Sequence, residues 1–302
     1  MRRSGRFVAV AIAGAMLFGA MSAGGPAMAK GPALPDGAGR IEVPGAAPDG
    51  SAMVVWTYRP KGLKRNRPVV IVMHGVKRNA SDYRDNWIDA ADKYRLLVVA
   101  PEMTKQQFPG GRGYNRGNMF AKDKTLQPRA LWAWPVIEKV FDAVKAGSGA
   151  TAGGYFIFGH SAGAQFVHRF ALFGGKTRAK AVLSANAGWY TMPTFDTDFP
   201  YGLKGSPLDA ARLKAAFGRP LILFLGDQDT NPNHKFLRRS TKANRQGAHR
   251  FARGHAFFKT AQEEARRLGA KFAWRLEVVP GVGHDNAGMT DAAARWIAGQ
   301  AR

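Results

Sequence analysis

Two patterns of apolar and polar positions alternate along this chain. Short segments rich in apolar residues are typical of buried strands, and they occur at 53–58, 68–73, 96–100, 155–158, 179–185, 221–225 and 272–279. Between them lie segments with helical periodicity, at 81–94, 135–145, 162–172, 256–268 and 289–298. Strands separated by helices require right-handed crossovers and a largely parallel sheet. The pattern therefore predicts an α/β fold with helices on both faces of the sheet.

The connecting segments add little regular structure. Residues 101–128 read as a loop, and their glycines match neither the dinucleotide fingerprint nor a P-loop because they follow Pro109 rather than a strand. Asn79, three positions before Asp82, is the expected N-cap of the helix over 81–94. Two longer insertions, at 189–217 and 231–253, are candidates for a small partial lid.

The amino-terminal residues have the pattern of a targeting segment. Arg2, Arg3 and Arg6 precede an apolar run, and Ala27-Met28-Ala29 forms an A-x-A cleavage site before Lys30. An uncleaved membrane anchor is the alternative, but glycines and Pro26 interrupt the end of the run. We expect a signal peptide at 1–29, a flexible segment at 30–39, a catalytic domain at 40–302, and a periplasmic or extracellular location.

Composition narrows the possible chemistry. The 302 residues include 45 Lys and Arg, 21 Asp and Glu, and no Cys, with a formal net charge of +24. The lack of cysteine excludes disulfides, thiolate metal sites and a cysteine nucleophile. A catalytic group must then come from a hydroxyl, a carboxylate or an imidazole.

The sharpest chemical signal is Gly159-His160-Ser161-Ala162-Gly163, which follows an apolar strand and opens a helix. This G-x-S-x-G pattern indicates a strained strand-to-helix turn, in which small neighbours leave room for an exposed serine. The positive end of the following helix lies next to the hydroxyl. We predict that Ser161 is a nucleophile.

A serine nucleophile needs a base, and seven histidines are available. His284 follows the last predicted strand in a compact Gly-Val-Gly loop, where a parallel sheet delivers residues to its site. It is the predicted base. His160 and His168 are expected to pack inside the protein, and His234, His249 and His255 to be solvated or structural.

The third member should be a carboxylate that orients the imidazole. The strand over 221–225 opens into Gly226-Asp227-Gln228-Asp229, and Asp229 is the preferred candidate because it has left the strand. Asp227 is the alternative, with a turn-capping role as its other interpretation. The chain order Ser161, Asp229, His284 is the order of α/β-hydrolases.

The remaining candidate site residues lie just after the ends of predicted strands. Backbone N–H groups of Ala162 and Val76 are the expected oxyanion donors, with Gly75 as a weaker candidate for the second. Trp189 and Tyr190 follow another strand and are candidates for substrate binding, although they could merely cover the sheet edge.

From about residue 67 onward the chain resembles exported α/β-hydrolases of the polyhydroxybutyrate depolymerase and feruloyl or acetylxylan esterase group. The matching segments are His74-Gly75-Val76, the G-x-S-x-G motif, Gly226-Asp227-Gln228-Asp229 and Gly281-Val282-Gly283-His284. The resemblance implies hydrolysis of a small or polymeric carboxylic ester through an acyl-serine intermediate, without cofactor or metal.

The basic charge leaves other functions open. Eight Lys and Arg between 235 and 259, with no acidic residue among them, would attract anionic envelope material or acidic substrates, or form an ordinary solvated surface. No nucleic-acid-binding module is present in the sequence, so specific nucleic-acid binding is not expected. The alternatives to an esterase are a peptidase or amidase on the same triad, and a noncatalytic envelope-binding protein.

Overall fold

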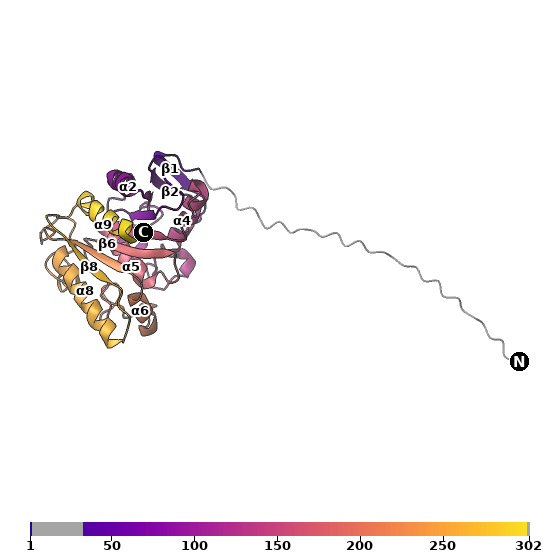
Figure 1. The fold of residues 1–302 in the computed structure, drawn as a ribbon. Coiled ribbons are helices and arrows are strands. Elements are labelled where there is room, and N and C mark those ends of the chain that lie inside the picture. The colour runs from indigo at the N-terminus through magenta and orange to yellow at the C-terminus, as the bar shows by residue number, and fades with distance from the viewer. Residues whose placement is uncertain (2–32, 301–302) are drawn as a thin grey trace.

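The computed structural model describes Met1 and residues 33–300 (Figure 1). The predicted signal peptide at 1–29 lies outside the described residues, apart from Met1, and so do positions 30–32 of the predicted flexible segment. Within residues 33–300, no helix is both long and apolar enough to cross a bilayer.

One sheet of eight strands organises the described chain, in the order β1-β2-β4-β3-β5-β6-β7-β8. The pairs β1–β2 and β2–β4 are antiparallel, and all other neighbours are parallel. The sheet confirms the predicted α/β class. The strands are β1 Gly37–Val43, β2 Met53–Arg59, β3 Val69–Met73, β4 Leu97–Pro101, β5 Tyr155–His160, β6 Ala179–Ala185, β7 Leu221–Gly226 and β8 Arg275–Val279.

Helices cover both faces of this sheet, as the sequence predicts (Figure 1). One face carries α1 Ala80–Asp85, α2 Ile88–Tyr94 and α9 Asn286–Gln300. The other carries α4 Pro135–Ser148, α5 Ala162–Phe173, α6 Ala210–Phe217 and α8 Arg250–Arg267. Short helices in the loops are α3 Gly110–Gly113, η1 Arg129–Leu131 and α7 Thr241–Asn244.

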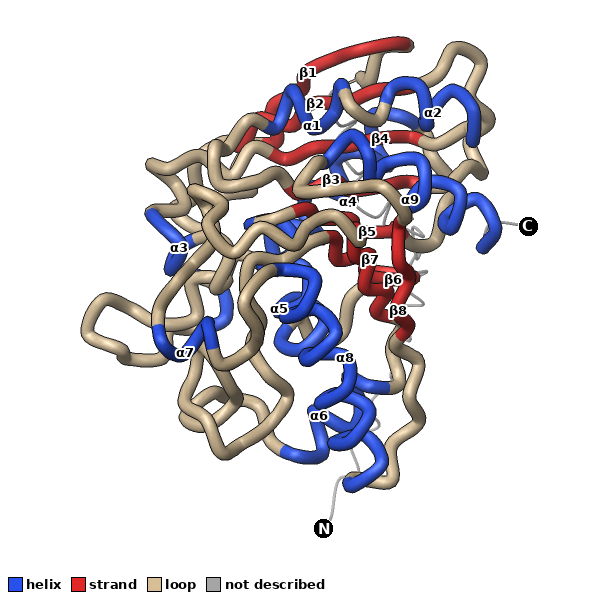
Figure 2. Tube along the Cα trace, turned by 90° about the vertical axis from the view of Figure 1, so that its left-hand side faces the viewer, coloured by secondary structure: helices blue, strands red, loops and turns tan. Residues whose placement is uncertain are grey.

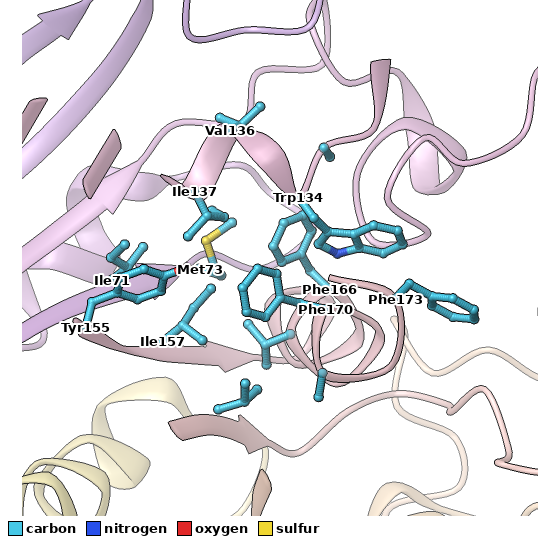
Figure 3. Packing of buried hydrophobic residues seen from close by; sticks show 14 of the residues in the cluster. Ile71, Met73, Trp134, Val136, Ile137, Tyr155, Ile157, Phe166, Phe170 and Phe173 are labelled. Carbon is cyan, nitrogen blue, oxygen red and sulfur yellow. The ribbon is translucent and has the colours of Figure 1, made fainter. Parts of the chain in front are cut away.

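Alternation along the strands divides the apolar residues into two cores. Ile71 and Met73 of β3 point into the core beneath α4 and α5, whereas Val70 and Val72 point into the core beneath α1, α2 and α9. Figure 3 shows the first core, where Phe166 and Phe170 of α5 pack near Ile157. Central strands buried on both faces are therefore apolar at every position.

The structure differs from the sequence prediction in its helix boundaries. The helix expected over 81–94 is broken at Asn86 and Trp87. Asn79 occupies the predicted N-cap position, but its side chain donates to Asp82 and accepts no backbone N–H of the helix. The two insertions contain regular structure of their own, since α6 lies in one, while the other holds α7 and the start of α8. α6 and α7 span only eight and four residues, which is too short for a helical period to be recognised.

β1 begins at Gly37, inside the segment predicted to be flexible. Gly37, Ala38 and Gly39 pair with residues 57–59 of β2 through backbone hydrogen bonds, which require no apolar side chain. A Cβ at Gly39 would lie 2.6 Å from the Pro35 ring, so glycine permits this close packing. Gly37 to Gly39 thus extend the strand without an apolar pattern, which begins only at Ile41 and Val43.

Two buried histidines are fixed in their neutral form by their hydrogen bonds. His74 directs Nδ1 at the Gly75 carbonyl, 3.0 Å away, and accepts the Met103 N–H at Nε2, also at 3.0 Å. His168 likewise directs Nδ1 at the Ala164 carbonyl and accepts the Thr191 N–H. A second proton on either ring would remove an acceptor. Burial lowers the pKa of His74 to about 3 and the pKa of His168 well below its ordinary value.

We therefore expect the protein to lose stability as the pH falls below 6.5. As the pH falls, these histidines are protonated in the unfolded chain before they are protonated in the folded protein. Each histidine therefore lowers the free energy of unfolding by about 1.4 kcal/mol per pH unit, until the pH reaches its folded-state pKa. Urea unfolding at a series of pH values measures this slope. In His168→Gln, the amide oxygen retains an acceptor but does not titrate. The pH dependence of the free energy of unfolding should therefore be shallower by about 1.4 kcal/mol per pH unit, the effect of one proton. An unchanged slope would contradict the assignment.

The loops after the carboxyl ends of the central strands gather on one side of the sheet, together with α3 and α7 (Figure 2). Parallel strands deliver all these loops to the same edge. The candidate chemical residues named above lie at this edge.

Candidate active site

Ser161 occupies a strained turn between β5 and α5. Its φ of 58° and ψ of −112° lie in a region that non-glycine residues rarely adopt. A Cβ at Gly163 would lie 2.0 Å from the Met73 carbonyl oxygen, and one at Gly159 would lie 2.4 Å from Gly163. Glycine is required at both positions because the backbones approach so closely. The structure thus has the turn that the G-x-S-x-G pattern predicts.

Three side chains from three different loops form one hydrogen-bonded chain. His284 Nε2 lies 3.0 Å from Ser161 Oγ, and His284 Nδ1 lies 2.8 Å from Asp229 Oδ2. A carboxylate only accepts hydrogen bonds, so Nδ1 carries the proton and Nε2 of the neutral ring is free to accept the serine proton. Asp229 is buried and His284 is partly buried. Ser161, Asp229 and His284 are thus brought together as the sequence predicts.

Asp227, the alternative carboxylate, lies elsewhere. Its Oδ1 accepts the Gly281 N–H at 2.8 Å, and among the described residues it is Asp229, not Asp227, that bonds to the imidazole of His284. This bond holds the start of the loop that carries His284. The turn-capping interpretation of Asp227 therefore fits its position.

A buried arginine contacts the same carboxylate. Arg250 Nη1 lies 3.2 Å from Asp229 Oδ1, and Arg250 Nη2 lies 3.0 Å from His234 Nδ1. Both Arg250 and Asp229 have side chains at most 2% exposed. Sequence reasoning assigned Arg250 to a basic run and His234 to a solvated or structural role. The structural role fits the bond to Arg250, and the ring of His234 lies 5.1 Å from that of His284.

We expect Arg250→Met to lower kcat by about tenfold or more, with a smaller change in KM. The substitution removes a charged hydrogen bond that fixes Asp229, while Arg250 does not line the cavity at Ser161. Steady-state kinetics on p-nitrophenyl acetate measure both constants, and Arg250→Lys should recover part of the loss because it keeps the charge. Wild-type kcat in a folded Arg250→Met protein would contradict this role.

Asn186 ties the three loops together. It has a positive φ of 51°, and its side chain accepts the Gly226 N–H and donates to the Gly283 carbonyl, both at 2.9 Å. These bonds join the end of β6 to the end of β7 and to the residue before His284. In the sequence, the only indication of this role is that Asn186 directly follows a predicted strand.

The end of β3 lies close to the nucleophile turn. Gly75 leaves room for Tyr83, whose hydroxyl would lie 2.6 Å from a Cβ there and is 3.2 Å from His160 Nδ1. The ring of His160 lies 4.6 Å from the ring of His284. Val76 is exposed and, with Ala162, lines the cavity at Ser161. Both expected oxyanion donors therefore belong to residues at the mouth of this cavity.

The cavity at Ser161 has a volume of about 370 Å³. Its lining combines apolar and basic side chains, among them Val76, Trp189, Phe236, Arg78, Lys105 and Arg238. Exposed Phe236, in the loop after β7, was not predicted from the sequence because nothing in that loop's pattern distinguishes it.

The two aromatic residues predicted to bind substrate lie in different surroundings. Trp189 lines the cavity, but Tyr190 is fully buried, and its ring stacks on Phe257 of α8 at 4.5 Å. Gln246 exchanges two hydrogen bonds with the Tyr190 backbone and fixes this orientation. Tyr190 is thus a core residue, whereas its neighbour Trp189 lines the cavity.

Two further arginines support the loops around the cavity. Arg78 donates to the carbonyls of Met103, Phe108 and Gly110. Arg253 is buried and donates to the carbonyls of Gly188 and Arg238. The basic run between 235 and 259 is thus only partly a solvated surface. Among the described residues, no group of three or more His, Asp or Glu is arranged to hold a metal ion.

Comparisons with known proteins agree with this arrangement. No model of a known protein family matches the chain, and no curated protein matches it. Among solved structures, the chain is similar to poly(aspartic acid) hydrolase-1 from Sphingomonas sp. KT-1, at 40% identity and a TM-score of 0.84, covering 87% of this chain and 99% of that chain.

It is also similar to LpqC, a poly(3-hydroxybutyrate) depolymerase from Bordetella parapertussis, at 39% identity and a TM-score of 0.80, covering 87% of this chain and 91% of that one. A fluorophosphonate-binding serine hydrolase, FphF of Staphylococcus aureus, shares the fold at 16% identity and a TM-score of 0.55, covering 88% of this chain and 99% of that one. From its sheet, its site and these relatives, the chain belongs to the α/β-hydrolase family and is a serine hydrolase.

Proposed function

We propose that this protein cleaves carboxylic esters through an acyl-serine intermediate, with Ser161 as nucleophile, His284 as base and Asp229 as the group that orients it. The observation that carries the proposal is the continuous chain of hydrogen bonds from Ser161 Oγ through the imidazole to Asp229. In such a chain the base removes the serine proton as the oxygen attacks.

The proposed reaction has two steps, acylation of Ser161 and hydrolysis of the acyl-serine. Ser161 Oγ attacks the ester carbonyl while His284 Nε2 takes its proton, and the same proton then passes to the departing alcohol. Water attacks the acyl-serine next, gives its proton to His284, and the serine oxygen leaves with that proton. Backbone N–H groups of Ala162 and Val76 are the proposed donors to the oxyanion formed in each step.

The test is hydrolysis of a panel of neutral esters that spans acyl length, acetylated sugars, feruloyl esters and hydroxyalkanoate oligomers. The purified protein should hydrolyse at least the short p-nitrophenyl esters, and Ser161→Ala should lose this turnover. A hydroxyalkanoate oligomer as the best substrate would support depolymerisation. Ester turnover that persists in Ser161→Ala would contradict the proposed nucleophile.

A second candidate is hydrolysis of amide bonds in an acidic polymer, which a similar protein is named for. The basic lining of the cavity favours it, because Lys105 and Arg238 bring positive charge to the opening at Ser161. The same triad serves amides, provided that His284 protonates the amine as it leaves. Release of new amino groups from poly(aspartic acid) distinguishes this candidate, and their absence would exclude it.

We also propose that the chain is exported and loses residues 1–29. The support is the basic start, the apolar run and the A-x-A site of the sequence. Mature protein recovered from the periplasm or medium should begin at Lys30, as read by intact-mass spectrometry. A cell-associated product that retains Met1 would contradict this proposal.

A further inference from the structure

Four arginines lie near one another beside the cavity at Ser161, and two of them lie over the rings of Trp189 and Tyr201. We call Arg112, Arg116, Arg169 and Arg238 the arginine cluster. The guanidinium carbons of Arg169 and Arg238 lie over the Trp189 ring, 4.2 and 5.5 Å from its centroid. Arg238 also lies over the ring of Tyr201, 5.7 Å from its centroid, and donates through Nε to its hydroxyl at 2.5 Å. The aromatic rings thus hold two cations in fixed positions.

The cluster carries charge that no carboxylate of the described residues neutralises. Arg169 is fully buried and donates only to neutral oxygens, those of Thr191, Asn115 and Gln165, while its buried Nη2 has no partner in the described chain. A buried charge without a counter-ion is costly. Burial lowers the pKa of Arg169, and neighbouring Arg116 lowers it further.

Arg116 extends the cluster toward solvent. Its guanidinium is partly buried and has no hydrogen-bond or ion-pair partner among the described residues. Burial lowers the pKa of Arg116, and the nearby cations Arg238 and Arg112 contribute to the same shift. Cations held this close together favour an anion between them.

Arg116 lines a second cavity, of about 600 Å³. Its lining includes six cationic side chains and one carboxylate, Asp198, which lies 3.9 Å from Lys242. The six cations are Arg112, Arg116, Lys122, Lys124, Lys204 and Lys242.

Arg116, which lines the cationic cavity, lies close enough to Arg238, which lines the cavity at Ser161, for their charges to interact. Asn115 lines the cavity at Ser161 and the next residue, Arg116, lines the cationic one. Arg238 lines the first, and its partner Tyr201 follows Pro200, which lines the second. A chain with its scissile bond at Ser161 would therefore meet these cations as it extends away.

We propose that the arginine cluster and the cationic cavity form a subsite for carboxylate groups, which binds a polycarboxylate chain while one of its acyl bonds lies at Ser161. This inference rests on the proposed serine hydrolase function. Guanidinium groups bind carboxylates through two parallel hydrogen bonds. A chain that offers both acyl bonds and regularly spaced negative charges is a polymer of acidic units, whereas a neutral polyester would leave the cluster unneutralised.

The test measures binding separately from turnover. Fluorescein-labelled poly(aspartic acid) is titrated with the Ser161→Ala protein, and anisotropy gives the Kd at several salt concentrations. Arg116→Gln and Arg238→Gln, each added to Ser161→Ala, should raise the Kd by about tenfold, the effect of one charge-assisted hydrogen bond, and flatten its dependence on salt. Arg116 has no side-chain bond to lose in the described chain, so its variant should fold as the parent does, which thermal unfolding checks.

Arg266→Gln is the matched control. Arg266 is an exposed arginine at the far end of the 18-residue helix α8, roughly 25 Å along the helix from Arg250. It should change the Kd by no more than about twofold. An equal loss in all three variants would show attraction by net charge alone and would overturn the proposal. Equal affinity for polyphosphate would overturn the assignment to carboxylates.

The outcome is separable from that of the proposed function. Tight, Arg116-dependent binding by a protein that cleaves neither esters nor amides would support the subsite and contradict the function. Cleavage of neutral esters without Arg116-dependent binding of poly(aspartic acid) would support the function and overturn the subsite.

Discussion

Replacing His284 with alanine should lower kcat for p-nitrophenyl acetate by about 10⁵-fold to 10⁶-fold. The substitution removes the only imidazole nitrogen within hydrogen-bond distance of Ser161 Oγ in the described chain, 3.0 Å away. A serine hydroxyl without a base is a poor nucleophile at neutral pH. Steady-state kinetics on the folded variant measure the loss, which should appear in kcat rather than in KM.

His160 and His234 provide matched controls because both rings lie close to the ring of His284, while neither hydrogen-bonds to Ser161 Oγ in the described chain. His234→Ala should retain most of the turnover. His160→Ala should also retain turnover but lose stability, since this buried ring packs against His284 and accepts or donates one hydrogen bond with Tyr83. A loss in a folded His160→Ala protein equal to that in His284→Ala would contradict the choice of base.

Asp229→Asn should lower kcat by about 10⁴-fold with little change in the fold. The amide has nearly the shape of the carboxylate, but it presents an N–H to the imidazole and favours the wrong tautomer. It also cannot stabilise the imidazolium that forms as the serine attacks. Kinetics on the same ester, with circular dichroism as a check of folding, measure the effect.

Asp227→Asn is the control for this substitution. Asp227 lies two residues away and bonds to the Gly281 N–H through an oxygen that the amide retains. Its kcat should remain within about tenfold of the wild-type value. If Asp227→Asn lost as much turnover as Asp229→Asn, the assignment of the orienting carboxylate would be wrong.

The sequence predicted the fold and the meeting of the three side chains because both depend on local signals. Ser161, Asp229 and His284 each follow a strand recognisable from its apolar residues, and parallel strands bring their carboxyl ends to one edge. Glycines 159 and 163 were informative for a similar reason, since their spacing reflects a close backbone approach within a few residues.

Contacts between segments far apart in the sequence could not be predicted from such local signals. Arg250 and Asp229 are 21 residues apart, and only the start of α8 brings the guanidinium onto the carboxylate. Tyr190 was misplaced because its stacking on Phe257 depends on how α8 packs. Trp189 and Tyr201 lie in the segment between β6 and α6, whereas the arginines over their rings come from α5 and from the loop after β7. A basic residue in a sequence does not reveal whether its partner is water, a carbonyl or a substrate.

The most direct measurement of the central claim is labelling with a fluorophosphonate, followed by intact-mass spectrometry and peptide mapping. The reagent phosphonylates a serine only where a base and oxyanion donors activate it. One adduct on Ser161 is predicted for the wild-type protein, with slow labelling in His284→Ala and none in Ser161→Ala. An adduct on any other residue, or labelling that persists in Ser161→Ala, would contradict the account.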